Sequence, residues 1–390
     1  DVLTKEQLER YQAISKEYAI PKIITVSNQF VSEPTQCPIV IKPVKDVGLI
    51  HFSWSYLLTI AHVLLFKNDM NIEDEDQVEI MREVVRYLED KKSGVFGFHQ
   101  MKNGWSDVIE KINTGSILKS DDRDVCDAVV SWQQEEKDMA LILSRSLGVL
   151  VESGERKYKG NISARLSDDK NSVIDKKMLS SILRVKDAVS DIRITGLLEK
   201  RTVEMFVSLQ APHDKTTRGQ LGWIRRQLEN CKKRNEEGFK KLQANLYIDI
   251  RIKNSRIPVR MSIQSFDDIY EEVRDKELLE FKVLYIKDFG RKFASPKKFV
   301  EVMEQMLLDF YSIIIQHLSK WEPSAPKMVK PAEEEHPVPV AITSLESSRD
   351  DEAIVDNIGR ENNLSSDEDD EHTSDHSGLI NSEDAILDSD

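Results

Sequence analysis

The chain has 390 residues, enough for two or three domains, of which 39% are hydrophobic and 32% are charged. Its net charge of −14 is concentrated at the C-terminal end, because residues 331–390 hold 19 acidic and 2 basic side chains, a balance of −17 that leaves +3 for residues 1–330. The acidic total therefore does not argue against nucleic-acid binding by the first 330 residues.

The cysteine and hydropathy patterns exclude several other classes. Three cysteines lie far apart in the sequence, which supports neither a disulfide framework nor a zinc ribbon and favours a reducing cytoplasm. The longest apolar run, residues 56–66, contains His62 and is too short to span a bilayer, so we expect no membrane association. The chain begins at Asp1 rather than Met, which processing, an expression boundary or truncation of a longer protein would explain.

The first half of the chain predicts mainly helices. A helix over Thr4–Tyr18 is followed by "KIITVSN", which we expect to form a buried strand because it is rich in β-branched residues. After a proline-containing loop, a short strand leads into an apolar helix capped near Ser53. Further helices are expected at residues 75–90, 103–115 and 121–147.

The second half alternates between strands and helices. A domain change is expected between residues 154 and 175, where Gly, Asn, Ser and Asp accumulate. The alternation that follows favours an α/β layer with a partly parallel sheet. The expected strands are residues 202–210, 244–252 and 279–288, and the expected helices are 217–231, 265–274 and 296–321. From about residue 323 the chain is acidic with few aromatic residues, which predicts disorder.

Gln7 and Tyr11 lie one turn apart on the first predicted helix, directly before the strand "KIITVSN". This pattern resembles the last motif of the RecB-like nucleases, a branch of the PD-(D/E)XK fold, in which such a pair helps to position DNA. "QLERY" followed by "IITVSNQF" also resembles a largely uncharacterised bacterial family, sometimes labelled stress-response proteins. The alternative is an ordinary helix with a surface Gln and a half-buried Tyr, since a two-residue pattern recurs by chance.

Later stretches resemble the same bacterial family, and the resemblance covers residues 1–325 loosely. They are "HFSWSYLL" through "MKNGWSDV", then "QAPHDKTTRGQLGWIRRQLENCKKR", and then the last helix with the "DFGRKFASPKK" before it. In the second of these stretches, a capping box is expected between Thr217 and Gln220 at the start of a helix.

Two basic groups could contact phosphate. Arg218 and Arg225 share a helix face, with Arg226 beside them, near a helix start whose backbone N–H groups attract anions. Arg291 and Lys292, with Lys297 and Lys298, precede or begin the last helix. The alternative for both groups is a solvated basic surface without a ligand.

The resemblance implies a truncated restriction-endonuclease-like core. In the nuclease branch, a catalytic Asp and a Glu-x-Lys pair stand on strands before the Gln–Tyr helix and hold Mg²⁺. They have no counterpart here, so no catalytic or metal-binding residue is assigned to this chain, and Mg²⁺ is expected only for an intact form. As given, the chain would be inactive.

The resulting expectation is a cytoplasmic α/β (α+β) protein that binds DNA in stress response or defence. Its divisions would be the nuclease-core remnant (1–50), a helical subdomain (51–153), a second α/β domain (154–322) and a disordered acidic tail (323–390). The rival hypothesis is a non-enzymatic interaction protein whose α/β domain and acidic tail bind a protein partner. We find no nucleophile–base constellation for another class of enzyme.

Overall fold

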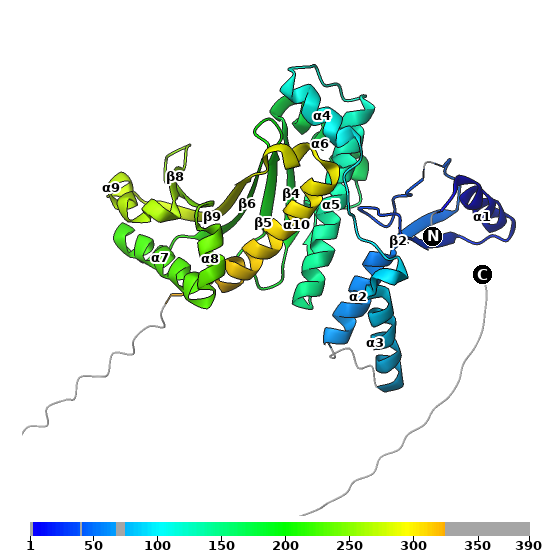
Figure 1. Cartoon of the computed structure of the whole chain (residues 1–390), viewed down its shortest axis with the longest axis horizontal. Coiled ribbons are helices and arrows are strands. Elements are labelled where there is room, and N and C mark those ends of the chain that lie inside the picture. Colours follow the sequence, from blue (N-terminus) through cyan, green and yellow to red (C-terminus); the bar gives the residue numbers. More distant parts are fainter. Residues whose placement is uncertain (1–2, 40, 68–74, 324–390) are drawn as a thin grey trace, which may run out of the picture. The chain divides into compact units, whose positions relative to one another are not determined.

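The computed structural model describes residues 3–39, 41–67 and 75–323, which combine helices with two β-sheets (Figure 1). The expected mixed α/β class is therefore confirmed. The acidic tail expected at 323–390 lies outside the described residues from position 324 onward.

The chain begins with a helix and a two-stranded parallel sheet. Helix α1 (Lys5–Glu17) starts at Thr4, and β1 (Lys22–Ser27) pairs in register with β2 (Gly48–Ser53). The prediction of a buried strand was wrong for β1, because Ile24 is 63% exposed. Among the described residues β1 has only β2 as a partner, so neither its free edge nor its outer face is covered by another strand.

Helices follow directly, as expected. In α2 (Trp54–Lys67), the backbone N–H of Tyr56 donates to the Ser53 hydroxyl at 3.2 Å, which confirms the predicted cap. Helix α3 (Glu75–Glu89) packs beside α2 and is followed by the short 3-10 helix η1 (Lys91–Ser93).

The long helix α5 (Arg123–Leu147) and the shorter α4 (Gly104–Asn113) belong to the same core as the residues after position 154. Trp105 stacks against Trp132 with ring centroids 6.2 Å apart, and its indole N–H donates to the Phe293 carbonyl at 2.6 Å. The sequence division at 153/154 stays a prediction, but the hydrophobic core runs across it.

A seven-stranded sheet forms the centre of this core. Its strands, in spatial order, are β3 (Glu152–Ser153), β4 (Met178–Arg184), β5 (Ile192–Leu197), β6 (Thr202–Gln210), β9 (Leu278–Asp288), β7 (Leu246–Ile252) and β8 (Val259–Ser262). Along β6, buried and half-buried side chains alternate, as in a sheet with one face turned to the core.

The expectation of a partly parallel sheet was wrong for this sheet, because all its pairings are antiparallel. The strands β6 and β7 do run in the same direction, with helices between them in the chain. However, β9 lies between them in space and pairs antiparallel with both. Strand–helix alternation correctly predicts the crossover but cannot show that a later strand fills the gap.

The remaining helices connect and cover the strands. Helix α10 (Pro296–Ile313) crosses the sheet on its near side in Figure 1, with α8 (Glu236–Gln243) beside it. The helix expected to reach residue 321 ends at Ile313. The other helical segments are η2 (Arg156–Tyr158), α6 (Ile162–Lys176), α7 (Thr217–Arg234), η3 (Ile263–Asp268), α9 (Ile269–Val273), η4 (Gly290–Ala294) and η5 (Ile315–His317).

Candidate nucleic-acid interface

Gln7 has a structural role at the start of α1. Its side-chain oxygen accepts a hydrogen bond from the Thr4 backbone N–H at 3.0 Å, while the Thr4 hydroxyl accepts from the Gln7 N–H at 3.3 Å. This reciprocal capping box satisfies two backbone donors and accounts for Gln7 without a ligand. Tyr11, one turn later, is 44% exposed.

The α1 and β1 segments have an inverted burial pattern. The inner side of α1 buries the polar Gln12 and Ser15 beside Leu8, and the paired strands bury Thr25 and His51, which share a 2.9 Å hydrogen bond. The large apolar side chains are turned outward instead. We call them the α1–β1 apolar set: Tyr11, Ile14, Tyr18, Ile20 and Ile24, which are between 38% and 68% exposed.

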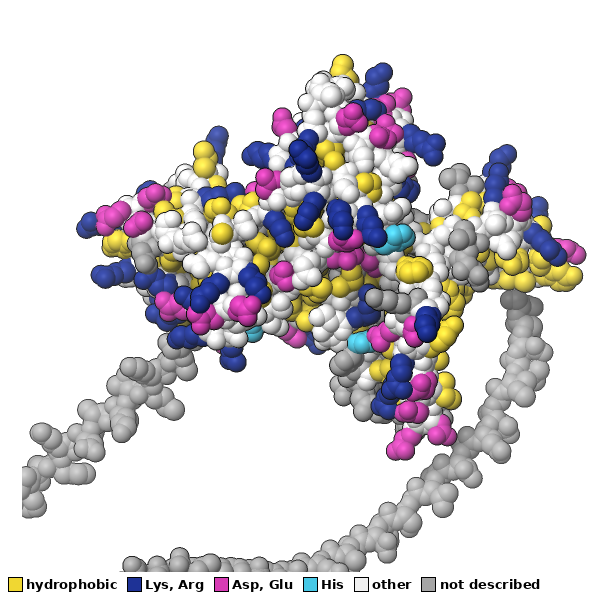
Figure 2. Space-filling view, in the orientation of Figure 1, with side chains coloured by type: hydrophobic (Ala, Val, Ile, Leu, Met, Phe, Trp, Pro, Cys, Tyr) yellow, Lys and Arg dark blue, Asp and Glu magenta, His cyan; other side chains and the backbone are white. Residues whose placement is uncertain are grey.

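Figure 2 shows hydrophobic side chains gathered along one side of the segment that carries α1. Soluble proteins bury most of their large apolar side chains, so this exposed set is a candidate contact surface.

Helix α7 begins at Thr217, as the sequence predicted, but its capping residue differs from the predicted one. Thr216, not Thr217, is the N-cap, and its hydroxyl accepts from the Gly219 N–H at 3.3 Å. Thr217 instead donates to the Lys276 carbonyl, and the buried Gln220 side chain donates to the Pro212 carbonyl at 2.8 Å. Both side chains tie α7 to neighbouring loops, so neither forms the expected capping box.

The structure brings Arg218 and Arg225 together in a groove of about 380 Å³, which we call the α7 groove. Its other lining residues are Leu221, Gly222, Phe266, Ile269 and Tyr270. The Arg225 guanidinium lies over the Phe266 ring, 5.9 Å from its centroid, in a cation–π contact. Arg226 is exposed but is not among the lining residues.

Arg291 and Lys292 form a second basic group with Lys297 and Lys298, which we call the α10 basic patch. All four side chains are exposed and belong to η4 or to the first turn of α10. A hydrogen bond from Lys298, together with the charges of Lys297 and Lys292, lowers the pKa of the Glu301 carboxyl, so these lysines lie near one another. Figure 2 shows Lys and Arg side chains in a row over the start of α10.

The start of α10 has two further features that suit an anion. Its first turn contains no acidic side chain, and the N-cap residue Ser295 makes no side-chain hydrogen bond to the helix. Pro296 occupies the first helical position. The partial positive charge of the helix start therefore adds to that of the four basic side chains.

The α7 groove and the α10 basic patch are separate, because α7 packs near the C-terminal end of α10 whereas the patch lies at its start. Near the end of α7, the Cys231 thiol donates to the Ile314 carbonyl, just beyond the last residue of α10. The α10 basic patch lies before and within its first turn, and an 18-residue helix is about 27 Å long. Arg291 and Lys292 are therefore not part of the same site as Arg218 and Arg225.

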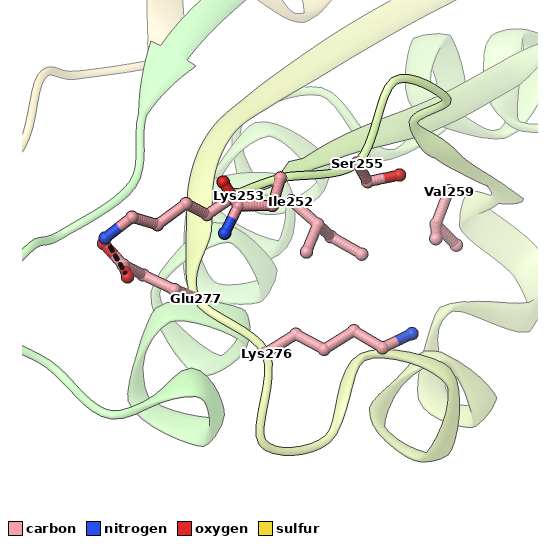
Figure 3. Close-up of a pocket in the computed structure, with 7 residues that line it drawn as sticks. Ile252, Lys253, Ser255, Val259, Lys276 and Glu277 are labelled. Atoms are coloured by element: carbon pink, nitrogen blue, oxygen red, sulfur yellow. Dashed lines mark hydrogen bonds and ion pairs between the residues drawn. The ribbon is translucent and has the colours of Figure 1, made fainter.

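A further pocket of about 400 Å³ lies beside the β7–β8 hairpin (Figure 3). Lys253 on one side is paired with Glu277 at 2.6 Å, and the Lys276 ammonium donates to the Glu272 carbonyl. Both lysines already have protein acceptors, and so does the Ser255 hydroxyl, which donates to the Ile257 carbonyl at 2.8 Å. We therefore assign no chemistry to this pocket, which no pattern in the sequence had indicated.

Sequence reasoning missed three carboxyl groups buried on α5. Glu136 has an ion pair with Arg165 and accepts backbone N–H groups of Gly154 and Ile182 at 3.0 and 2.9 Å. Glu135 is fully buried, and neither of its carboxyl oxygens has a hydrogen-bond partner among the described residues. The only sequence signal is "QQEEKDMAL", in which acidic residues interrupt the apolar stripe of a long helix.

Burial raises the pKa of two carboxyl groups in this region, to about 6 for Asp138 and to about 8 for Glu304.

The described residues contain no group of three or more His, Cys, Asp or Glu side chains arranged to hold a metal ion.

Comparisons with protein families, with curated proteins and with solved structures found no match to this chain. Within residues 3–39, 41–67 and 75–323, no helix has the length and apolar character needed to cross a membrane.

Proposed function

We propose that this protein is a nuclease-like, DNA-binding protein of the PD-(D/E)XK type that acts in the bacterial cytoplasm, in stress response or defence. The observation that carries DNA binding is the α10 basic patch, where four basic side chains surround an uncapped helix start. Backbone N–H groups and cationic side chains are the usual ligands of DNA phosphates.

The nuclease-like part of the proposal is supported by the beginning of the chain. Helix α1 carries Gln7 and Tyr11 on one side and leads into β1, in the order that the RecB-like resemblance implies. The strands of a nuclease core would cover the α1–β1 apolar set. The proposal assigns no residue of this chain to the catalytic Asp, to the Glu-x-Lys pair or to Mg²⁺, and it concerns DNA binding alone.

The test is the salt dependence of duplex DNA binding, measured by fluorescence anisotropy. The Lys292→Gln/Lys297→Gln double variant should bind more weakly at low salt. The slope of log K against log salt should fall by about 0.9 for each phosphate that the variant no longer neutralises. The matched control is Lys232→Gln/Lys233→Gln in the last turn of α7, which changes the charge equally and should leave the slope unchanged.

Two outcomes would contradict the proposal. If the unaltered chain does not bind duplex DNA at low salt, it does not function as a DNA-binding protein. If both double variants weaken binding equally, the attraction is a general charge effect and the α10 basic patch is not the interface.

A second candidate function is a non-enzymatic interaction protein, and the α1–β1 apolar set is the observation that favours it. A protein partner would cover those five side chains just as a nuclease core would. This candidate expects Tyr18→Lys and Ile24→Lys to abolish partner binding, whereas it expects the Lys292→Gln/Lys297→Gln variant to retain it. DNA binding that depends on the α10 basic patch would favour the first candidate.

A further inference from the structure

Gly222 lies in the interior of α7, where packing does not require a glycine. A Cβ atom built at this position meets only the Arg226 side chain, at an ordinary contact distance of 3.7 Å. Its backbone is helical and is not in the left-handed region. Glycine destabilises a helix interior relative to alanine, so the fold alone would favour alanine here.

The α7 groove gives a reason for the missing side chain. Gly222 follows Arg218 by four residues and precedes Arg225 by three, so all three positions share one helix face. Gly222 is itself a lining residue, and without a side chain it leaves the floor between the two arginines open. Apart from the arginines, the described residues that line the groove are apolar or aromatic.

These features define the chemistry of a ligand. An exposed guanidinium at Arg218 suits a phosphate. The Arg225 guanidinium lies over the buried Phe266 ring, and Tyr270 of α9 supplies a half-buried ring at the wall. Tyrosine rings and guanidinium planes are the surfaces on which an unpaired base stacks. A base inside a duplex is already stacked and paired, so it is not free to enter.

We infer that the α7 groove binds one unpaired nucleotide of a nucleic-acid strand, with its phosphate at Arg218 and its base against Tyr270. The inference rests on the nucleic-acid binding proposed above, and it adds a preference for single strands. Gly222 provides the space for the base, and Phe266 acts as a positioning residue for Arg225.

The experiment compares a single-stranded oligonucleotide with the duplex of the same sequence, using the full chain. Gly222→Leu fills the floor of the groove and should lower single-strand affinity by about tenfold, the loss expected for one stacked base, while duplex affinity stays unchanged. Gly222→Ala should raise the melting temperature and still weaken single-strand binding. Arg218→Gln should weaken single-strand binding more than its matched control, Lys233→Gln, in the last turn of the same helix and outside the groove.

The outcomes separate the two proposals. If Gly222→Leu and Gly222→Ala leave single-strand affinity unchanged while the α10 variants lower it, the groove inference is overturned and DNA binding stands. If neither strand form binds the unaltered chain, the proposed function fails. In that case, calorimetry with a 5′-mononucleotide tests the groove separately. If the mononucleotide binds the unaltered chain and Gly222→Leu abolishes this binding, the α7 groove is a nucleotide site. If the mononucleotide does not bind, the groove inference is overturned.

Discussion

At the scale of single residues, Glu135 shows how burial sets a protonation state. Its carboxyl group is fully buried among the packed side chains of α5 and has no hydrogen-bond partner among the described residues. Burial, and then the charges of Glu304 and Asp138, raise its pKa well above the ordinary 4.5. An unpaired ionised carboxylate in such surroundings would be very costly, so the group is neutral in the folded protein.

This protonation predicts a pH-dependent effect of Glu135→Gln. The pKa of the Glu135 carboxyl is raised in the folded state, so the folded protein keeps a proton that the unfolded chain releases above about pH 4.5. The free energy of unfolding of the wild type therefore decreases as the pH rises. The neutral Gln variant lacks this loss, so its stability relative to the wild type should increase between pH 5 and pH 8. Urea denaturation at both pH values measures it, and a difference independent of pH would contradict the assignment.

At the scale of elements, strong periodicity made some parts predictable. The helices α3, α5 and α7 were expected within a few residues of their bounds, because each has an apolar stripe at helical spacing. Helix α6 was missed because its sequence is polar, with Val173 as its only fully buried side chain. It is held by tertiary contacts such as that between Arg165 and Glu136, which no local pattern reveals.

The candidate site was predictable only in part, for a similar reason. Helical spacing placed Arg218 and Arg225 on one face of α7. The aromatic wall comes from Phe266 and Tyr270, about 40 residues later, in η3 and α9, where a single helix over 265–274 was expected. No local spacing links these rings to the face of α7. The capping box of Gln7, in contrast, has a local signal, because Thr4 stands three residues before Gln7, although the sequence prediction did not use it.

The packing of α5 on the sheet predicts a large effect of Gly196→Ala in β5. A Cβ atom at this position would lie 2.9 Å from the Trp132 ring, which is buried and cannot turn away because Trp105 and Phe299 pack against it. We expect a decrease of about 1–3 kcal/mol in the free energy of unfolding. The control is Gly48→Ala in β2, where the nearest atom is 3.6 Å away. Equal decreases in the two variants would contradict this packing.

At the scale of the whole molecule, residues 3–323 share more than the sequence divisions suggest. The expected helical subdomain contributes Trp105 and Trp132 to a core that also contains Phe293 and Phe299. A division at residue 154 therefore passes between the layers of one core, and the described residues form one compact unit.

This shared core predicts that residues 154–322 do not fold alone. Without α4 and α5, a fully buried layer of apolar side chains on the sheet would be exposed to water, a cost too large for a marginally stable fold. A fragment of residues 54–323 keeps this layer and should unfold cooperatively on heating, as followed by near-ultraviolet circular dichroism. A cooperative transition for residues 154–322 alone would instead confirm the boundary that the sequence predicted.

The α1–β1 apolar set and the α10 basic patch are two surfaces with opposite responses to solution conditions. Contacts between apolar surfaces strengthen on warming from low temperature and in sulfate, because both conditions make the exposure of hydrocarbon to water less favourable. Contacts between lysines and phosphates weaken as ions are added, because bound counterions are released. Low salt therefore favours whatever the α10 basic patch holds, and strongly salting-out conditions favour whatever covers Tyr18 and Ile24.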